Sequence, residues 1–206
     1  MKIEIWSDIV CPWCYLGKHR LDEAVRSIDG PVTVAFRSYQ LDPSPIPRPV
    51  PLLEWLSARF GAAAGAQMAR TVTGVAAASG LVLNFDIAIA ANTFDAHRLV
   101  GWAAGQGRQL DMVEALHRAH FTDGVDLGSP AALADVAAGL GLDGTAARAY
   151  LDTPAGAERV RADLAEARQL GITSVPTFVI DGKYAVSGAQ EAATLRAALT
   201  EISRAG

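Results

Sequence analysis

The only two cysteines of this chain stand three positions apart, and this pair constrains the fold more than any other feature. They lie in the segment Cys11-Pro12-Trp13-Cys14. Before them, residues 3–8 alternate apolar and polar side chains as a strand does. After them, apolar residues recur with helical spacing over residues 16–28. The sequence therefore predicts a strand that leads into a helix, with the cysteine pair at the start of that helix.

A helix start is a chemically distinct place for a thiol. The first backbone N–H groups of a helix have no partner within it and carry a partial positive charge, which stabilises a thiolate. Pro12 suits the first helical position and supports the site, because its φ is preset and it needs no N–H partner. We therefore interpret Cys11 as the nucleophile and Cys14 as the resolving thiol. Trp13 is expected to shield the disulfide or to offer substrate an apolar surface.

The composition argues against several classes of function. The formal net charge is -4 and no run of Lys or Arg occurs, so we expect no nucleic-acid partner. No stretch approaches the roughly 18 apolar residues of a membrane span, and no signal-peptide pattern is found. We therefore expect a cytoplasmic protein without a membrane partner, of open oligomeric state. In that reducing compartment, paired cysteines are more typical of catalysis or metal binding than of a structural disulfide.

The remaining pattern predicts two α/β segments separated by a helical block. A second strand at residues 32–36 completes a βαβ unit, and a proline-rich connector that cannot join a sheet follows it. Helical spacing without a convincing strand then continues to about residue 170. Two strand patterns flank Asp181-Gly182, a strong hairpin signal, and a last helix follows them. We predict one domain from residues 1–50 and 171–206, with residues 51–170 as an inserted helical domain.

Several blocks of the sequence resemble a known family. The cysteine pair, together with a distant Val175-Pro176-Thr177 that opens the hairpin, resembles the thioredoxin fold, and the long insertion resembles its DsbA-like branch. More narrowly, residues 5–17 resemble the opening of FrnE-type DsbA-family oxidoreductases, which are related to 2-hydroxychromene-2-carboxylate isomerases. Residues 40–43, 92–98 and 184–190 resemble further family blocks. The resemblance implies an α/β thioredoxin fold with a mixed four-stranded sheet and an all-helical insertion.

The same resemblance implies a dithiol-disulfide oxidoreductase or isomerase that acts on protein or small-molecule disulfides. It implies no resident cofactor and no metal, and glutathione enters only as a co-substrate. Val175 and Pro176 match the cis-proline loop of the family, where the Val175 backbone would pair with an extended substrate segment. Gly188 would either let the substrate backbone approach closely or only relieve crowding before the last helix.

The match departs from the family at one position. Thioredoxin and DsbA carry a buried carboxylate six residues before the first cysteine, where this chain has Ile5. The strand period places Glu4 on the opposite face from Ile5. Asp8 is then the candidate to accept the proton of Cys14, with a loop or capping role as the alternative.

The block at residues 92–98 has a structural and a functional interpretation. Asn92 or Thr93 would cap the following helix, and Asp95 suits the positive end of that helix. His97 is harder to explain as a capping residue. Asn92 and His97 are therefore also candidate substrate-binding residues on the side of the groove opposite the cysteines.

Two other functions compete with disulfide exchange. One is a glutathione-dependent isomerase or transferase for an aromatic small molecule, because the helix start would also stabilise a bound thiolate. Such relatives need no second cysteine, so Cys14 favours exchange. The other is a structural zinc module built from Cys11, Cys14, His117 and His120, whose spacing is allowed. Pro12 and the proline loop disfavour it, and His117 and His120 are expected on a solvated helix face.

Overall fold

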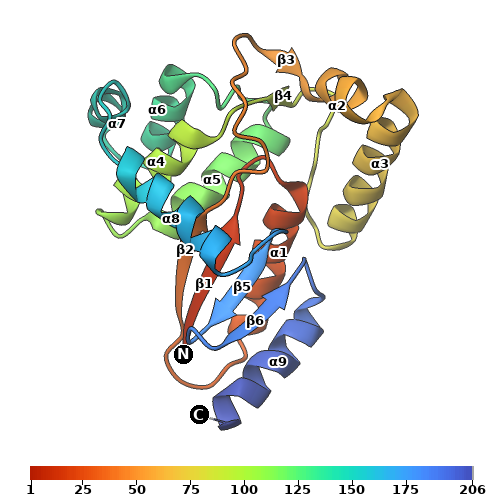
Figure 1. Cartoon of the computed structure of the whole chain (residues 1–206), viewed down its shortest axis with the longest axis vertical. Coiled ribbons are helices and arrows are strands. Elements are labelled where there is room, and N and C mark those ends of the chain that lie inside the picture. Colours follow the sequence, from red (N-terminus) through yellow and green to blue (C-terminus); the bar gives the residue numbers. More distant parts are fainter. Residues whose placement is uncertain (206) are drawn as a thin grey trace.

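The sheet of the α/β part joins the two ends of the chain. The computed structural model describes residues 1–205, and its four-stranded sheet has the order β2-β1-β5-β6. The strands are β1 (Lys2–Ser7), β2 (Thr33–Ser38), β5 (Thr177–Ile180) and β6 (Tyr184–Ser187). β1 runs parallel to β2 and antiparallel to β5, and β5 pairs antiparallel with β6. The predicted mixed four-stranded sheet is therefore confirmed, and Figure 1 shows β1 and β5 side by side.

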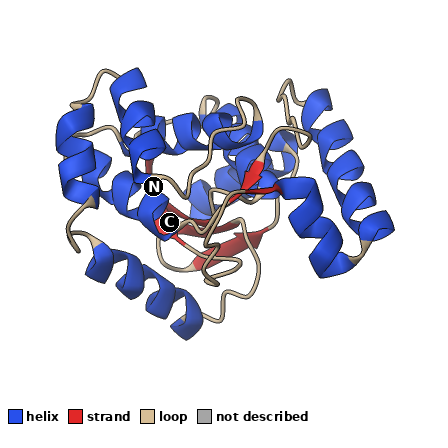
Figure 2. Ribbon diagram, turned by 90° about the horizontal axis from the view of Figure 1, so that it is seen from above, coloured by secondary structure: helices blue, strands red, loops and turns tan. Residues whose placement is uncertain are grey.

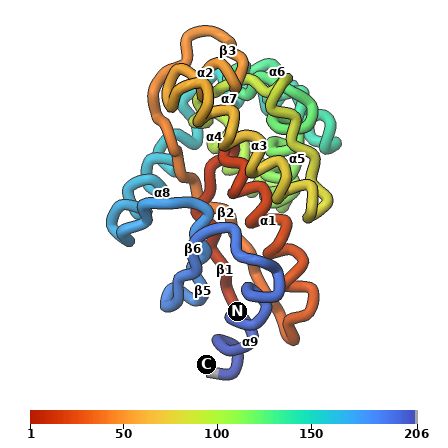
Figure 3. Tube along the Cα trace, turned by 90° about the vertical axis from the view of Figure 1, so that its right-hand side faces the viewer, coloured from red at the N-terminus to blue at the C-terminus, as the bar shows by residue number. Residues whose placement is uncertain are grey.

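Two helices cover one face of this sheet. They are α1 (Pro12–Val25) and α9 (Ala192–Ala205), which pack against each other. Alternation along β1 sends Ile3 and Ile5 to that face, where they meet Phe178 of β5 and Leu21 of α1 in a buried cluster. Both termini lie at this end of the molecule, away from α2 (Leu52–Phe60) and β3 (Val50–Pro51) (Figure 3). The strand and helix periods in the sequence thus produce one shared core.

The helical block contains seven helices among residues 51–170, and the helices surround the strands when the molecule is seen from above (Figure 2). None of the helices within residues 1–205 has the length and apolarity needed to cross a bilayer. The seven helices are α2 (Leu52–Phe60), α3 (Ala62–Ala78), α4 (Phe94–Ala104), α5 (Gln109–Phe121), α6 (Pro130–Gly139), α7 (Gly144–Leu151) and α8 (Ala157–Gln169).

Two predictions for this region are wrong, because β3 (Val50–Pro51) pairs with β4 (Ile89–Ala90) in a short antiparallel ladder. The proline-rich segment does join a sheet, and the block expected to contain no strand contains β4. Pro51 has no N–H to donate, but the next residue, Leu52, donates its N–H to the carbonyl of Ala88 at 2.8 Å. A ladder of two residues leaves no periodic pattern, and proline is tolerated at a strand edge.

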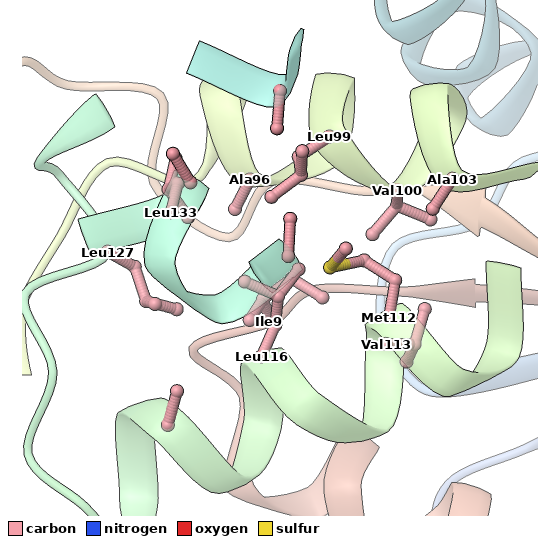
Figure 4. Close-up of a cluster of buried hydrophobic side chains, with 14 of the residues drawn as sticks. Ile9, Ala96, Leu99, Val100, Ala103, Met112, Val113, Leu116, Leu127 and Leu133 are labelled. Carbon is pink, nitrogen blue, oxygen red and sulfur yellow. The ribbon is translucent and has the colours of Figure 1, made fainter. Parts of the chain in front are cut away.

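The block packs around the start of α1 through two hydrophobic cores. The larger core, shown in Figure 4, joins α4, α5 and α6 and includes Ile9 from the loop before α1. The second core joins α3 to Tyr15 and Leu16 of α1 and to Phe121 of α5. Residues near the cysteines are thus buried in the inserted part. The division into residues 1–50 with 171–206 and residues 51–170 stays a prediction.

The larger core should respond strongly to loss of a single side chain. Leu116 of α5 is fully buried there, and Leu116→Ala should lower the free energy of unfolding by about 2–5 kcal/mol, since the cavity cannot collapse completely. Leu170→Ala is the matched control, because that leucine is 54% exposed, and it should change stability by no more than about 0.5 kcal/mol. Urea denaturation measures both, and equal losses would contradict the assignment of this core.

Candidate active site

The cysteines lie where the sequence places them, at the start of α1. Cys11 is the N-cap residue, with φ of -92° and ψ of 111°, and Pro12 is the first residue of the helix. The carbonyl of Cys11 accepts the first helical hydrogen bonds, from the N–H groups of Cys14 at 3.0 Å and Tyr15 at 3.2 Å. No acidic residue lies in the first turn. The positive end of the helix therefore acts on the Cys11 sulfur without an acidic side chain in the same helical turn.

The two thiols are free and differ in environment. Cys11 is 4% exposed, whereas Cys14 is completely buried. Burial raises the pKa of the Cys14 thiol well above its ordinary value, and the hydrogen bond and charge of Cys11 raise that pKa further. The Ser7 side chain and the Asp8 backbone act in the opposite direction. Cys14 is therefore held in its neutral form.

The loop before β5 brings a backbone carbonyl to the nucleophile. The Val175–Pro176 peptide bond is cis, and Sγ of Cys11 lies 4.0 Å from the carbonyl oxygen of Val175. The carbonyl of Pro176 accepts the N–H of Gly188 at 2.8 Å, and Gly188 has φ of 81°. The structure thus unites Cys11, Val175, Pro176 and Gly188, which are far apart in the sequence.

Gly17 makes this approach possible, and sequence reasoning missed its role. A Cβ atom at Gly17 would lie 2.7 Å from Cγ of Pro176 and 3.4 Å from the ring of Phe178. Contacts below about 3.0 Å force a shift, so only glycine lets α1 and the proline loop lie this close. The available signal was a glycine inside a helical pattern, which costs about 1 kcal/mol relative to alanine and calls for a packing reason.

An apolar cavity of about 440 Å³ opens beside the cysteine pair. Its floor is formed by the start of α1, including Cys11, Pro12 and the 39% exposed Trp13, and by Val175. Its walls come from the inserted helices α2 and α3. The structure therefore places Trp13 and Val175 with Cys11 at one cavity, and their roles in substrate binding stay a prediction.

Asp8 and His97 form a buried pair beneath the loop that follows β2. The Asp8 carboxylate accepts the N–H of Leu41 at 2.8 Å and lies 3.2 Å from Nε2 of His97. Nε2 of His97 also lies 2.8 Å from the carbonyl oxygen of Tyr39, so this nitrogen is the donor to both acceptors. The His97 side chain has no exposed surface. It does not line the cavity at Cys11.

Asn92 likewise supports the proline-rich segment and is not found at the cavity. Its amide donates to the carbonyls of Pro43 and Ser44, both at 3.0 Å, and its Oδ1 accepts the N–H of Phe94 at 3.0 Å. The last bond matches the predicted capping role at the start of α4. The structure therefore does not bring Asn92 or His97 into contact with the space beside the cysteines.

The expectation of a solvated face at His117 and His120 is wrong, because both side chains are fully buried on α5. Nδ1 of His117 donates to the carbonyl of Ile9 at 2.9 Å, and its ring stacks on Tyr15 with centroids 5.0 Å apart. Desolvation lowers the pKa of His117 to about 3 and that of His120 to about 4. Within residues 1–205, no three His, Cys, Asp or Glu side chains are arranged to hold a metal ion.

A family model of DsbA-like thioredoxin domains matches residues 2–200. The chain belongs to this family. A probable DsbA oxidoreductase from Streptomyces coelicolor, SCO1869, is 41% identical to it, with a TM-score of 0.91 and coverage of 98% of this chain and 89% of the other. With its paired cysteines, the chain is a DsbA-like thiol-disulfide oxidoreductase.

Two more distant structures share the fold. A 2-hydroxychromene-2-carboxylate isomerase is 18% identical, with a TM-score of 0.73 and coverage of 99% and 97% of the two chains. The cytosolic disulfide reductase DsbM from Pseudomonas aeruginosa is 21% identical, with a TM-score of 0.68 and full coverage of both chains. DsbM has also been solved with glutathione. At these identities, the likeness establishes the fold alone.

Replacement of Gly17 should separate the proline loop from the nucleophile. Gly17→Ala should lower the free energy of unfolding by about 1–3 kcal/mol, as overpacking does, and should slow disulfide reduction. Gly74→Ala is the matched control, because Gly74 lies within α3 with no neighbour within 4 Å of the new Cβ. It should stabilise the protein by about 0.5–1 kcal/mol. Urea denaturation and a disulfide reductase assay measure the pair, and unchanged stability and activity in Gly17→Ala would contradict the close contact.

The buried histidines should make stability depend on pH. Their pKa values in the folded protein, about 3 for His117 and about 4 for His120, lie below the ordinary 6.5, so the unfolded chain binds protons that the folded chain does not. Their stabilising contribution is therefore complete above pH 6.5 and falls as the pH drops, by up to about 1.4 kcal/mol per pH unit for each imidazole.

Urea midpoints at pH 7 and pH 5 test this dependence. His120→Phe should reduce the loss of stability between these two values, because one titrating group is removed from the core. His19→Phe, on the less buried surface of α1, is the matched control and should leave the loss unchanged. An equal pH dependence in the wild type and His120→Phe would show that His120 does not contribute.

Proposed function

We propose that the protein exchanges disulfides through Cys11 as nucleophile and Cys14 as resolving thiol. The observation that supports this proposal most strongly is that the two free thiols at one helix start differ in their surroundings. Cys11 lines a cavity, whereas Cys14 is completely buried. The Cys11 thiolate attacks one sulfur of the substrate disulfide, and the other sulfur leaves as a thiolate. Cys14 then attacks Sγ of Cys11, so the captured group also leaves reduced and a Cys11–Cys14 disulfide remains.

The order of these steps follows from the coupling between the two sulfurs. Cys11 raises the pKa of Cys14 through its hydrogen bond and its charge. Once Cys11 is joined to substrate in a mixed disulfide, it carries no charge, and this part of the pKa elevation disappears. The Ser7 side chain and the Asp8 backbone then stabilise the Cys14 anion. Capture of a substrate by Cys11 thus makes Cys14 easier to ionise, while burial continues to raise the pKa of Cys14.

Trp13 and Val175, which line the cavity with Cys11, bind substrate in this proposal, and Gly188 supports the loop that holds Val175. The Val175 carbonyl, 4.0 Å from Sγ of Cys11, is an acceptor for a donor on the substrate. Trp13 offers an apolar surface at the cavity. Gly188 lies behind the loop and is held to Pro176 through its N–H, which keeps the loop close to α1.

We further propose that the enzyme acts as a reductase or isomerase in the cytoplasm, as a FrnE-type member of the family, with glutathione as a co-substrate. The sequence blocks shared with FrnE-type proteins support this assignment. The fold is also shared with DsbM, a cytosolic disulfide reductase whose structure has been solved with glutathione.

Trapping tests the exchange mechanism directly. Cys14→Ser should hold substrates as mixed disulfides through Cys11, which non-reducing electrophoresis and mass spectrometry detect. Cys11→Ser should form no such adduct and should reduce disulfides only at the uncatalysed rate. Turnover by the double variant Cys11→Ser, Cys14→Ser at the wild-type rate would disprove the mechanism. Full, strictly glutathione-dependent turnover by Cys14→Ala would instead favour a glutathione-dependent isomerase.

A further inference from the structure

The shape of the cavity beside Cys11 limits what can reach the sulfur. Cys11 is only 4% exposed, and it lies on the floor of a cavity of about 440 Å³. Small-molecule sites in proteins usually measure about 300–1,000 Å³. A disulfide must therefore enter a space of molecular size, beneath the inserted helices α2 and α3, before the nucleophile can attack it.

Most of the residues that line this space are apolar. Aromatic and aliphatic side chains of the two inserted helices face it, and the ring of Phe85 closes it from the following loop. The wall residues of the helices are Trp55, Leu56 and Phe60 of α2 and Met68, Ala69 and Val72 of α3. Apolar rings are stabilised in such surroundings in proportion to the area they remove from water, and aromatic pairs gain further from ring contacts.

The charges at the cavity are already paired. Asp42 and Arg59 are the only charged residues among the described residues that line it, and they form an ion pair with each other. The Arg59 guanidinium also lies over the rings of Trp55 and Phe60, at 5.1 and 5.8 Å from their centroids. A ligand with several carboxylates would find no unpaired cation here, and burial of an unpaired carboxylate is costly.

We propose that this cavity selects small, uncharged aromatic disulfides and the mixed disulfides of aromatic thiols as substrates. The proposal rests on the exchange chemistry given above. Cys11 forms a disulfide with one aryl sulfur and releases the other as an aryl thiolate. Attack by Cys14 then releases the second aryl thiolate and leaves the Cys11–Cys14 disulfide. An external dithiol supplies the two electrons that return both cysteines to thiols.

Substrate comparison is the first part of the test. The probes are 4,4'-dithiodipyridine, oxidised glutathione, cystamine and a disulfide-linked peptide, each with dithiothreitol as the reductant. Aryl thiolates leave faster in any exchange, so each kcat/KM is divided by the rate constant of the same disulfide with dithiothreitol alone. The corrected kcat/KM of the aryl disulfide should exceed that of each of the other three disulfides by about tenfold or more.

Variants of the cavity wall are the second part. Met68→Lys should lower the corrected kcat/KM of the aryl disulfide by about tenfold, because the substitution places a charge among the rings. Ile87→Lys is the matched control, since Met68 and Ile87 are 48% and 50% exposed and Ile87 does not line the cavity. Ala69→Phe should fill the cavity and also lower the corrected kcat/KM of the aryl disulfide. Its control, Ala77→Phe on the exposed side of α3, should leave that value unchanged.

The possible results distinguish failure of the aromatic preference from failure of the exchange mechanism. Equal or higher corrected kcat/KM for the peptide or for oxidised glutathione would overturn the aromatic preference while leaving disulfide exchange intact. Unchanged aryl turnover in Met68→Lys would overturn the role of the cavity in the same way. Failure of all four disulfides to react faster than with dithiothreitol alone would instead disprove the exchange mechanism.

Discussion

The contact between α1 and the cis-proline loop is the constraint on which the active site depends. Residues 11 and 175 meet because β1 and β5 are hydrogen-bonded neighbours, with Ile5 opposite Phe178 and Trp6 opposite Thr177. β1 ends and β5 begins at the same edge of the sheet, and the missing side chain of Gly17 lets Pro176 lie against the helix. The Val175 carbonyl therefore comes to the Cys11 sulfur through backbone pairing and packing.

Helices between residues 51 and 170 hold the start of α1, and thus the cysteine pair, in position. Ile9 is buried in one helical core, whereas Tyr15 and Leu16 are buried in the other, so the start of α1 is held on both sides. Polar contacts reinforce this position, because Glu114 of α5 accepts hydrogen bonds from the Tyr15 hydroxyl and the Lys18 ammonium group. The segment that follows β1 supplies Cys11, and helices α2 and α3 supply apolar side chains to the cavity that Cys11 lines.

Local patterns predict much of this structure, whereas contacts between distant segments do not appear in them. A few neighbouring residues are enough to predict the helix start at the cysteine pair and the hairpin at Asp181-Gly182. The burial of His117 depends on the Ile9 carbonyl, which lies 108 positions away in the chain and accepts from its ring. No property of α5 alone reveals that partner. Gly17 is similar, since its role exists only because Pro176 packs against it.

The absence of a carboxylate at Ile5 leaves open which group takes the proton of Cys14, and the structure suggests an answer that needs no dedicated base. The Asp8 carboxylate is bound to Leu41 and His97, where it positions the loop after β2. The Asp8 backbone, rather than its carboxylate, lowers the pKa of Cys14, together with the side chain of Ser7. When Cys11 loses its charge in the mixed disulfide, its own contribution to the raised pKa of Cys14 ends, while the Ser7 side chain and the Asp8 backbone still stabilise the anion. Removal of the Cys14 proton thus becomes easier at the step where the anion is needed, without a carboxylate at position 5.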